Sequence, residues 1–454
     1  MKGGVALPRD FSHSLKAAVK LLRKHRFARV VSHYDADGVT AASVTVTCLR
    51  NAGMDLHTTI MKSLDKAAVE RIAQENNELV IFLDMGSGQI DKIERMGVDV
   101  IILDHHKPIR ESKIVEQVNP HFFKVDGTHD ISASGLAFSL AVAVDEKNWA
   151  SSPMAIAGIV GDMQHLGGFS DINESIIAGA AERGMIARSN GIRLSGDRLQ
   201  TMISESANPY FRGLSGRREA AIEFLKSAGL DPSAVYHDLD DGLRRRLVSL
   251  LTLRLLSQGC IRATIEQTVG EVLTVSSGCL RGLRIDDVAE LVNACGRLDH
   301  PGIGMALCLG DAAALTEAMK YRADYTSSLL LELRPIEEGA FEAREHIQII
   351  RPHRSSLAGA VCGISMQYLL DQTKPTIAIS KVEGSVKVSS RGTQELVSKG
   401  LDLAESLKKS AEPLGGVGGG HNVAAGATVP LVREDEFFKN LDAITGIQLK
   451  KKRG

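Results

Sequence analysis

The N-terminal part of the chain alternates short apolar runs with segments of helical spacing. Four runs have the length and the β-branched composition of buried strands, and a fifth, more polar run follows them, at residues 28–32, 56–61, 79–83, 98–103 and 114–118. The segments between them repeat apolar residues at the spacing of amphipathic helices. Strands that alternate with helices form right-handed crossovers and a parallel sheet. The pattern therefore predicts an α/β fold with a doubly wound parallel sheet in this part of the chain.

Acidic and imidazole side chains stand where several of these predicted strands end. Asp84 follows the third strand, and Asp104, His105 and His106 follow the fourth. Ligands of open parallel sheets bind beyond the carboxyl ends of the strands. We therefore expect the chemistry of this protein at that edge of the sheet.

The segment after the first predicted strand reads His33-Tyr34-Asp35-Ala36-Asp37-Gly38. If it stays extended, His33, Asp35 and Asp37 share one face, and two neighbouring carboxylates repel each other unless a cation lies between them. Gly38 would then allow a sharp turn into a helix over 39–50. A polar loop with Asp37 as the helix cap explains the same residues, and this segment alone does not decide between the two.

Two later segments carry further candidates. Residues 132–135 begin an apolar helix, and the small side chains there, Ser134 among them, would let an anionic ligand approach its N-terminus. The apolar run 154–160 ends in Gly161 and Asp162. Asp162 is either a helix cap or one more metal ligand.

The alternation breaks over 191–312, which predicts an inserted domain of mixed structure, and 313–337 has the composition of a connecting helix. Three arginines of the insertion could bind phosphates, but a solvated basic face explains them better, namely Arg212, Arg217 and Arg218. The role of the insertion stays open at this stage.

A smaller C-terminal α/β domain is expected over 338–454. The runs 376–380 and 385–390 flank Glu383-Gly384 as a hairpin, and Arg391 follows directly. The glycine-rich run 415–421 is either a flexible linker or a backbone cradle for an anion. Ala424-Ala425-Gly426 indicates close packing after it and favours binding, with His421 at the start of a short helix.

The bulk composition narrows the class of protein. The 454 residues are 44% hydrophobic and 24% charged with a net charge of −1, as expected for a multidomain globular protein without a global attraction to polyanions. No apolar run is long enough for a membrane span. Six cysteines without a C-x-x-C pair predict buried thiols in a reducing cytoplasm. A basic run stands at 450–453, and a frayed terminus explains it better than a phosphate contact.

The ordered motifs resemble those of the DHH phosphoesterase superfamily. They are His33-x-Asp35-x-Asp37-Gly38, Asp84, Asp104-His105-His106 and Gly161-Asp162, and the run Gly418-Gly419-Gly420-His421 resembles the glycine-rich motif of its associated substrate-binding domain. Within the superfamily the chain is most similar to archaeal RecJ-like single-strand exonucleases. The resemblance implies a DHH catalytic domain over 1–190 and a DHH-associated domain over 338–454.

The resemblance also implies the roles of single residues. Two divalent ions would be bound, one by His33 and Asp35 and the other by Asp37, His105 and Asp162, with Asp84 between them. The histidine ligands favour Mn²⁺ over Mg²⁺. His106 would contact the scissile phosphate and Asp104 would orient its neighbours. The expected substrate-binding residues are Ser134, Arg391, Gly418, Gly419, Gly420 and His421.

The implied activity is removal of mononucleotides from an end of single-stranded DNA or RNA. Two alternatives remain, hydrolysis of short substrates such as oligoribonucleotides, cyclic dinucleotides or nucleotide bisphosphates, and a scaffold role with replication or repair proteins. The complete ligand set disfavours a purely structural role. Strand polarity and the choice between DNA and RNA are not encoded in any residue that we can identify.

Overall fold

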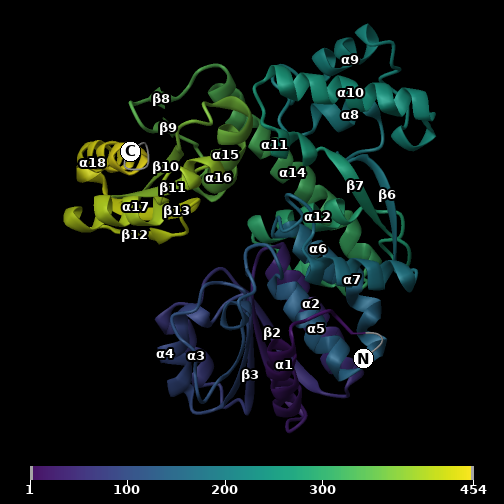
Figure 1. Ribbon diagram of the computed structural model, residues 1–454, viewed down its shortest axis with the longest axis vertical. Helices are drawn as coiled ribbons and strands as arrows, with labels where there is room; N and C mark the ends of the chain where they lie inside the picture. Colours follow the sequence, from purple (N-terminus) through teal and green to yellow (C-terminus); the bar gives the residue numbers. More distant parts are fainter. Residues whose placement is uncertain (1–3, 451–454) are drawn as a thin grey trace. The chain divides into compact units, whose positions relative to one another are not determined.

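The computed structural model describes residues 4–450, so most of the basic run at 450–453 lies outside the described residues. The chain divides into two compact units (Figure 1). Unit 1 contains the described residues up to Arg193 together with Gly270–Tyr325, and unit 2 contains Leu194–Val269 and the described residues from Thr326 onwards. The expected insertion over 191–312 therefore does not form one body, because its last third belongs to unit 1.

Unit 1 is built on a five-stranded parallel sheet in the order β2-β1-β3-β4-β5. Its strands are β1 (Phe27–His33), β2 (Asp55–Met61), β3 (Leu79–Leu83), β4 (Asp99–Leu103) and β5 (Glu116–Val118). The doubly wound parallel sheet predicted from the alternation is confirmed. All five residues of β3 are buried, as expected for a central strand covered on both faces.

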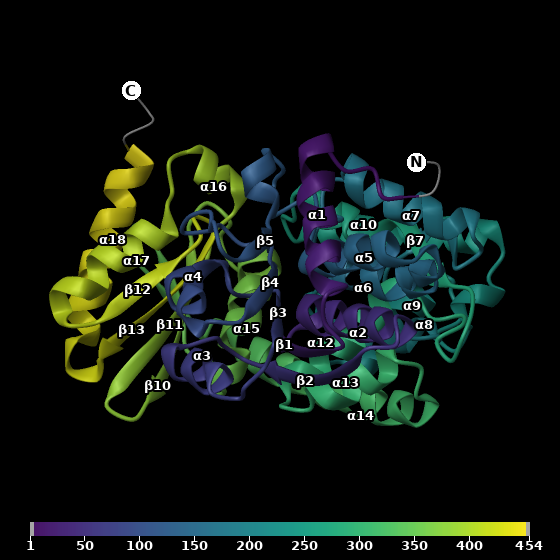
Figure 2. The same cartoon turned by 90° about the horizontal axis from the view of Figure 1, so that it is seen from below.

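Helices cover both faces of this sheet. Alternate residues of β3 point to opposite sides, so that Ile81 packs with one helical layer and Val80 and Phe82 pack with the other. One layer contains α1 (Arg9–Leu22), α2 (Ala36–Asn51), α5 (Ala133–Val144) and α6 (Ser152–Gly161), and the other contains α3 (Lys66–Ala73) and α4 (Ile90–Ile93). Figure 2 shows α1 beside α5 in the first layer.

The centre of the first layer is packed through a glycine. A Cβ atom on Gly158 of α6 would lie 2.2 Å from Ser134 Oγ of α5 and 2.3 Å from Thr40 Oγ1 of α2. Three helices can therefore meet closely only because this position has no side chain. Their contact fixes the start of α2 with Asp37, the start of α5 and the end of α6 before Asp162.

The remaining elements of unit 1 come from two parts of the chain. After α7 (Asp171–Glu182), β6 (Ile186–Ile192) pairs with β7 (Val269–Val275) in a small two-stranded antiparallel sheet. These two strands flank the segment 194–269 that belongs to unit 2. The later helices of unit 1 are α12 (Ile285–Arg297), α13 (Pro301–Cys308) and the first part of α14 (Ala312–Glu337), which is the expected connecting helix.

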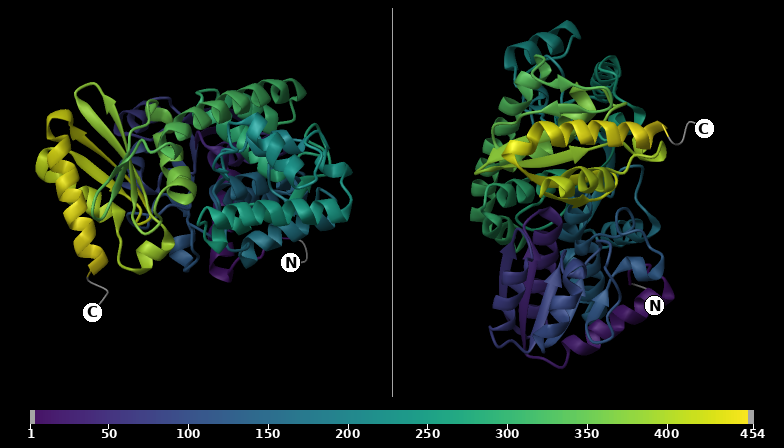
Figure 3. Two further views of the ribbon diagram at one scale, coloured as in Figure 1. Left: turned by 90° about the horizontal axis from the view of Figure 1, so that it is seen from above. Right: turned by 90° about the vertical axis from the view of Figure 1, so that its left-hand side faces the viewer.

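Unit 2 contains a six-stranded mixed sheet in the order β12-β13-β11-β10-β9-β8. The strands are β8 (Glu342–Ala343), β9 (Gln348–Ile350), β10 (Thr376–Val382), β11 (Ser385–Arg391), β12 (Val417–Gly420) and β13 (Ala424–Pro430). The predicted β10–β11 hairpin is confirmed, with Val382 opposite Ser385. The helices near the sheet are α15 (Ala358–Ile364), α16 (Gln394–Ser398), α17 (Leu403–Ala411) and α18 (Glu434–Lys450), and Figure 3 shows α18 in yellow along one face.

The helical part of the insertion is anchored inside unit 2. Its helices are α8 (Leu199–Ser204), α9 (Arg218–Ser227), α10 (Asp241–Ser257) and α11 (Arg262–Glu266). The Arg212 guanidinium donates to the carbonyl oxygens of Tyr368 (2.9 Å) and Leu369 (2.7 Å). Arg217 pairs with Glu337 at 2.5 Å. Arg212 and Arg217 are thus used for internal contacts, which differs from the solvated basic face that the sequence favours and gives no support to a phosphate contact.

Within residues 4–450, no helix has both the length and the hydropathy that are needed to cross a bilayer.

Candidate metal centre

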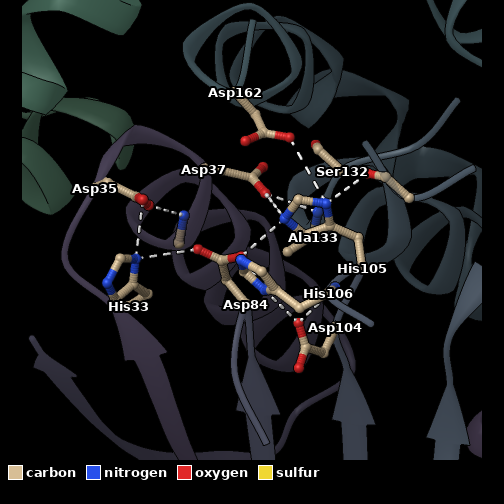
Figure 4. Close-up of polar contacts among 12 residues, drawn as sticks. His33, Asp35, Asp37, Asp84, Asp104, His105, His106, Ser132, Ala133 and Asp162 are labelled. Atoms are coloured by element: carbon tan, nitrogen blue, oxygen red, sulfur yellow. Dashed lines mark hydrogen bonds and ion pairs between the residues drawn. The ribbon is translucent and has the colours of Figure 1, made fainter. Parts of the chain in front are cut away.

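The histidines and carboxylates of the predicted site meet beyond the carboxyl ends of β1, β3 and β4 (Figure 4). His33 is the last residue of β1, Asp84 follows β3, and Asp104 follows β4. The carboxyl ends of parallel strands lie at one edge of a sheet, and therefore segments far apart in the sequence meet there. Within the described residues, groups that could hold a metal ion form three overlapping sets, His33-Asp35-Asp84, Asp37-His105-Asp162 and Asp84-His105-His106.

The segment after β1 does not stay extended, so the expected shared face of residues 33, 35 and 37 is wrong. The helix α2 already begins at Ala36, and Asp35, not Asp37, is its N-cap, accepting the Gly38 N–H at 3.1 Å. Gly38 lies inside the helix, where a Cβ atom would be 2.4 Å from the carbonyl oxygen of His33. The glycine permits this close approach of helix and strand and does not make a turn.

Asp37 is held by the N-terminus of a second helix. Its carboxylate oxygens accept the backbone N–H groups of Ala133 (2.7 Å) and Ser134 (2.9 Å) at the start of α5. A carboxylate is stabilised there by the unpaired N–H groups and the helix dipole. This N-terminus was expected to hold a substrate anion, and it holds Asp37 instead.

Ser134 is correspondingly not placed on a substrate surface. Its side chain is fully buried, and its Oγ donates to the Ala155 carbonyl oxygen at 2.9 Å. The prediction of a substrate-binding Ser134 is therefore corrected. Its backbone positions Asp37, and its hydroxyl ties α5 to α6.

Asp84 faces both halves of the cluster. Its Oδ2 lies 3.3 Å from His33 Nδ1, and its Oδ1 lies 3.2 Å from His105 Nε2. The backbone of Asp84 has φ +58°, in the left-handed region that aspartate tolerates better than most residues. The side chain is nearly fully buried, with 4% of the residue exposed. Two oxygens of one buried carboxylate thus point toward two different imidazoles.

His105 presents one ring nitrogen to the cluster. Its Nδ1 donates to the carbonyl oxygen of Gly127 at 2.6 Å, which leaves Nε2 for Asp84 and, at 3.8 Å, for Asp37. A hydrogen bond of this kind fixes the tautomer and ring orientation of a metal-binding histidine. Gln164 supports it, because its Nε2 donates to both Gly127 O and Asp162 Oδ2 at 2.9 Å.

Gln164 and Gly127 were not found from the sequence. Gln164 lies two residues after Asp162, and that proximity is its only signal in the sequence. Gly127 is in a loop, where a Cβ atom would lie 2.0 Å from the carbonyl oxygen of His105. A glycine that is required by a close contact across 22 residues has no local pattern that could reveal it.

Asp104 organises the segment after β4. Its Oδ1 accepts the backbone N–H of His106 at 3.1 Å and lies 2.8 Å from His106 Nδ1, and its Oδ2 accepts the Ser87 N–H at 2.9 Å. Burial opposes ionisation of Asp104, but the hydrogen bond from His106 lowers its pKa to about 2. The arrangement agrees with the expected orienting role, while the His106 side chain is 45% exposed.

The electrostatics of the cluster favour a bound cation. Burial and the Asp84 charge raise the pKa of Asp37. Burial raises the pKa of Asp162 to about 8, against the opposing charge of His105. Burial alone would lower the pKa of His33, but Asp35 and Asp84 raise it to about 11. Carboxylates crowded in a low-dielectric site are costly until positive charge compensates them.

The donor set fits divalent metal ions. Among the described residues, His33 Nδ1 and Asp84 Oδ1 are buried without a hydrogen bond, although imidazole and carboxylate neighbours lie within 3.3 Å. Ring nitrogens and carboxylate oxygens that lie this close together without hydrogen-bond geometry are placed as ligands of a common ion would be. Carboxylate oxygens with a few imidazoles suit Mn²⁺ or Mg²⁺ better than thiolate-preferring metals.

Unit 2 places the other predicted residues at one end of its sheet. Arg391 ends β11 opposite Ala424, and Gly420 pairs with Ala425. His421 lies in the β12–β13 turn, where its N–H donates to Ala424 O at 2.8 Å. The prediction of a short helix at His421 is wrong, because the glycine run forms the strand β12.

Two of the three glycines of β12 are required by packing. A Cβ atom on Gly418 would lie 2.7 Å from Leu407 O of α17, and one on Gly420 would lie 2.6 Å from Ala425 Cα. Gly419 has open space at that position. The run is therefore a closely packed strand and not a flexible linker, and the binding roles of Gly418, Gly419, Gly420, Arg391 and His421 remain predictions.

Comparisons with known proteins agree with this architecture. The model of the DHH family, N-terminal domain, matches residues 28–161, and the model of the DHHA1 domain matches residues 350–446. An uncharacterized protein of Methanocaldococcus jannaschii is 32% identical over 445 residues, 95% of this chain and 96% of the relative. The single-stranded-DNA-specific exonuclease RecJ of Thermus thermophilus is 28% identical over 162 residues, which are 33% of this chain and 24% of RecJ.

Solved structures show the same fold over nearly the whole chain. RecJ of Thermus thermophilus in complex with Mn²⁺ has a TM-score of 0.62 at 18% identity, covering 98% of this chain and 56% of RecJ. CDC45 of Entamoeba histolytica has a TM-score of 0.67 at 10% identity, covering 96% and 99% of the two chains. With its carboxylate–imidazole cluster and both family domains in place, the chain belongs to the DHH superfamily of metal-dependent phosphoesterases.

Proposed function

We propose that this protein is a two-metal phosphodiesterase that removes mononucleotides from an end of single-stranded DNA or RNA. The observation that carries the proposal is the position of Asp84, whose two oxygens face His33 on one side and His105 on the other. One carboxylate that serves two neighbouring ligand sets is what a pair of adjacent ions requires.

The proposed ligand sets follow the two sides of Asp84. His33 and Asp35 would hold one ion, and Asp37, His105 and Asp162 would hold the other, in agreement with two of the geometric groups. Bound Mn²⁺ or Mg²⁺ would supply a hydroxide at neutral pH and would neutralise charge on the phosphoryl oxygens. The protein contributes the fixed positions of these ligands, through the α5 N-terminus at Asp37 and the Gly127 carbonyl at His105.

His106 is the proposed phosphate contact. Asp104 fixes its ring at 2.8 Å and is itself held by the Ser87 N–H, so the imidazole is oriented before substrate binds. The buried Asp104 carboxylate favours the protonated ring and raises the pKa of His106, against burial, which would lower it. A cationic imidazole that is 45% exposed suits an anionic phosphate.

Arg391 and His421 are the proposed nucleotide contacts of unit 2. Both stand at the end of the sheet where β11 stops and β12 turns into β13. The Arg391 side chain lies along α15, next to Gly359. A Cβ atom on Gly359 would lie only 3.2 Å from a guanidinium nitrogen of Arg391, so the glycine leaves room for the arginine. A single-stranded nucleic acid as substrate is further supported by the name of the RecJ relative.

The test is metal-dependent digestion of DNA and RNA oligomers labelled at either end. We expect Mn²⁺-dependent release of mononucleotides from one labelled end by the wild type and none by Asp84→Asn. The labelled end and the digested sugar would give polarity and preference together. Hydrolysis of dinucleotides or cyclic dinucleotides alone would replace the proposal by a small-substrate phosphodiesterase, and metal binding without any hydrolysis would favour the scaffold alternative.

A further inference from the structure

The helix α1 carries an unusual surface. Its buried face consists of Phe11, Leu15, Ala18, Val19 and Leu22, which pack into the core of unit 1. At 100° per residue, the opposite face of the helix collects the exposed basic side chains of Arg9, His13, Lys16 and Lys20 within an arc of about 60°. Exposed Arg23 and Lys24 follow directly after the helix, and we name the six residues the α1 basic stripe. The helix lies outside the segment that matches the DHH family model.

The charges of this stripe are not compensated by the protein. Several surface cations of other helices pair with an acidic residue one turn away, as in Lys66–Glu70, Lys399–Glu395 and Lys409–Glu405. Within residues 4–450, none of the stripe residues forms an ion pair, and the guanidinium of Arg23 donates to the Val144 carbonyl oxygen. On a chain with a net charge of −1, such a surface is a local concentration of unpaired positive charge.

The acidic groups near the helix are few and sit at its borders. One of them is Asp145, which lines a pocket together with Leu22 and Arg23 at the C-terminal end of the helix. Asp10 is the one acidic residue of α1, and it lies on the flank of the stripe. Glu116 faces Ser14, at 3.4 Å from its Oγ, on the side toward the sheet. Beyond the C-terminal end, Asp99 and Glu78 pair with His25. The side chains of the α1 basic stripe therefore remain available to bind an anionic partner.

The stripe begins at the same sheet edge as the metal centre. Phe11 in the first turn of α1 stacks on Phe123 with ring centroids 4.8 Å apart. Phe123 is the last residue of the short helix η3 (Pro120–Phe123). In the same helix, His121 Nε2 lies 3.1 Å from the carbonyl oxygen of His105. From Arg9 to Lys24 the stripe then runs for about 22 Å, at 1.5 Å per residue, toward the opposite edge of the sheet.

We propose that the α1 basic stripe is a second binding surface for the sugar-phosphate backbone of the nucleic acid, separate from the metal centre. Its length matches several consecutive phosphates of one strand, and its lysines would contact them without reading bases. The apolar face of α1 is buried in the core, which disfavours the amphipathic insertion used at membranes. This inference rests on the proposed function only in that a polymer is the substrate.

The test measures binding apart from hydrolysis. Affinity for a labelled strand of about 20 nucleotides, longer than the stripe, is measured in EDTA as a function of salt for the wild type and for Lys16→Gln/Lys20→Gln. With a slope of about −0.7 for each phosphate contact of a single strand, the double variant should flatten the salt dependence by about 1.4. Affinity at about 0.1 M salt should fall roughly 25-fold.

A matched control is Lys66→Gln/Lys92→Gln, which removes the same charge from exposed positions of α3 and α4 in unit 1. It should leave affinity and salt dependence nearly unchanged. Metal-dependent hydrolysis of a dinucleotide, too short to reach the stripe, should be equal in all three proteins. Equal loss of binding in the control would overturn the inference, as would binding of wild type to anionic vesicles but not to strands. A wild type that binds strands through the stripe but hydrolyses none would refute the proposed function alone.

Discussion

Replacing Asp84 by Asn separates the metal-binding role of this residue from its role in the fold. The amide keeps the size and shape of the carboxylate but loses its charge, and asparagine tolerates the left-handed backbone at φ +58°. Alanine at the same position would add about 1 kcal/mol of backbone strain and would confuse the two effects. The Asp84→Asn variant is therefore the cleaner probe.

The magnitude follows from linkage between binding and unfolding. An ion present at a hundredfold excess over its Kd stabilises the native state by about 2.7 kcal/mol, which for a unit of this size raises Tm by about 5–11 °C. Because Asp84 touches both ligand sets, the variant should lose most of this shift. Without metal, it should be about as stable as the wild type, since the Asp84 charge raises the pKa of Asp37 and Asp162 by repulsion but also raises the pKa of His33 and His105 by attraction.

The assay is calorimetry with Mn²⁺ and with EDTA, beside Asp55→Asn at an exposed position of β2 as a control. The control should keep the full metal-dependent shift. If Asp84→Asn also kept it, Asp84 would not be a ligand, and the assignment of the cluster as a metal centre would be refuted. A variant that unfolds in EDTA well below the wild type would refute this balance and would show that the Asp84 charge stabilises the metal-free site.

Three further predictions concern other parts of the chain. Gly158→Ala should lower the free energy of unfolding by about 1–3 kcal/mol in denaturant titrations, because its Cβ would overlap Ser134 and Thr40, whereas Gly302→Ala, with open space, should not destabilise. Gln164→Ala should weaken Mn²⁺ binding by about 10–100-fold in titration calorimetry through the loss of its bonds to Gly127 and Asp162, and an unchanged Kd would contradict that role. Arg391→Gln should raise KM for oligonucleotides roughly tenfold or more with Mn²⁺ affinity unchanged, and an equal KM would exclude a substrate contact.

The sequence by itself determined the class of fold and most of the metal centre. Apolar runs such as 79–83 have a local cause, since a strand that is buried on both faces must be apolar throughout. The residues that follow these runs lie at the carboxyl ends of parallel strands, and this rule alone brings His33, Asp84 and His105 together. The hairpin at Glu383-Gly384 was likewise predictable from the sequence, because its turn residues are local.

Only the tertiary structure decided how these residues are used. The N-terminus of α5 holds Asp37 rather than a substrate, because α2 and α5 pack closely against Gly158 of α6. The glycine run at 418–420 is a strand, because α17 packs on it and excludes side chains. Such contacts join residues tens to hundreds of positions apart, so local sequence patterns do not predict them. The same holds for the two units, whose boundaries depend on which segments share a core.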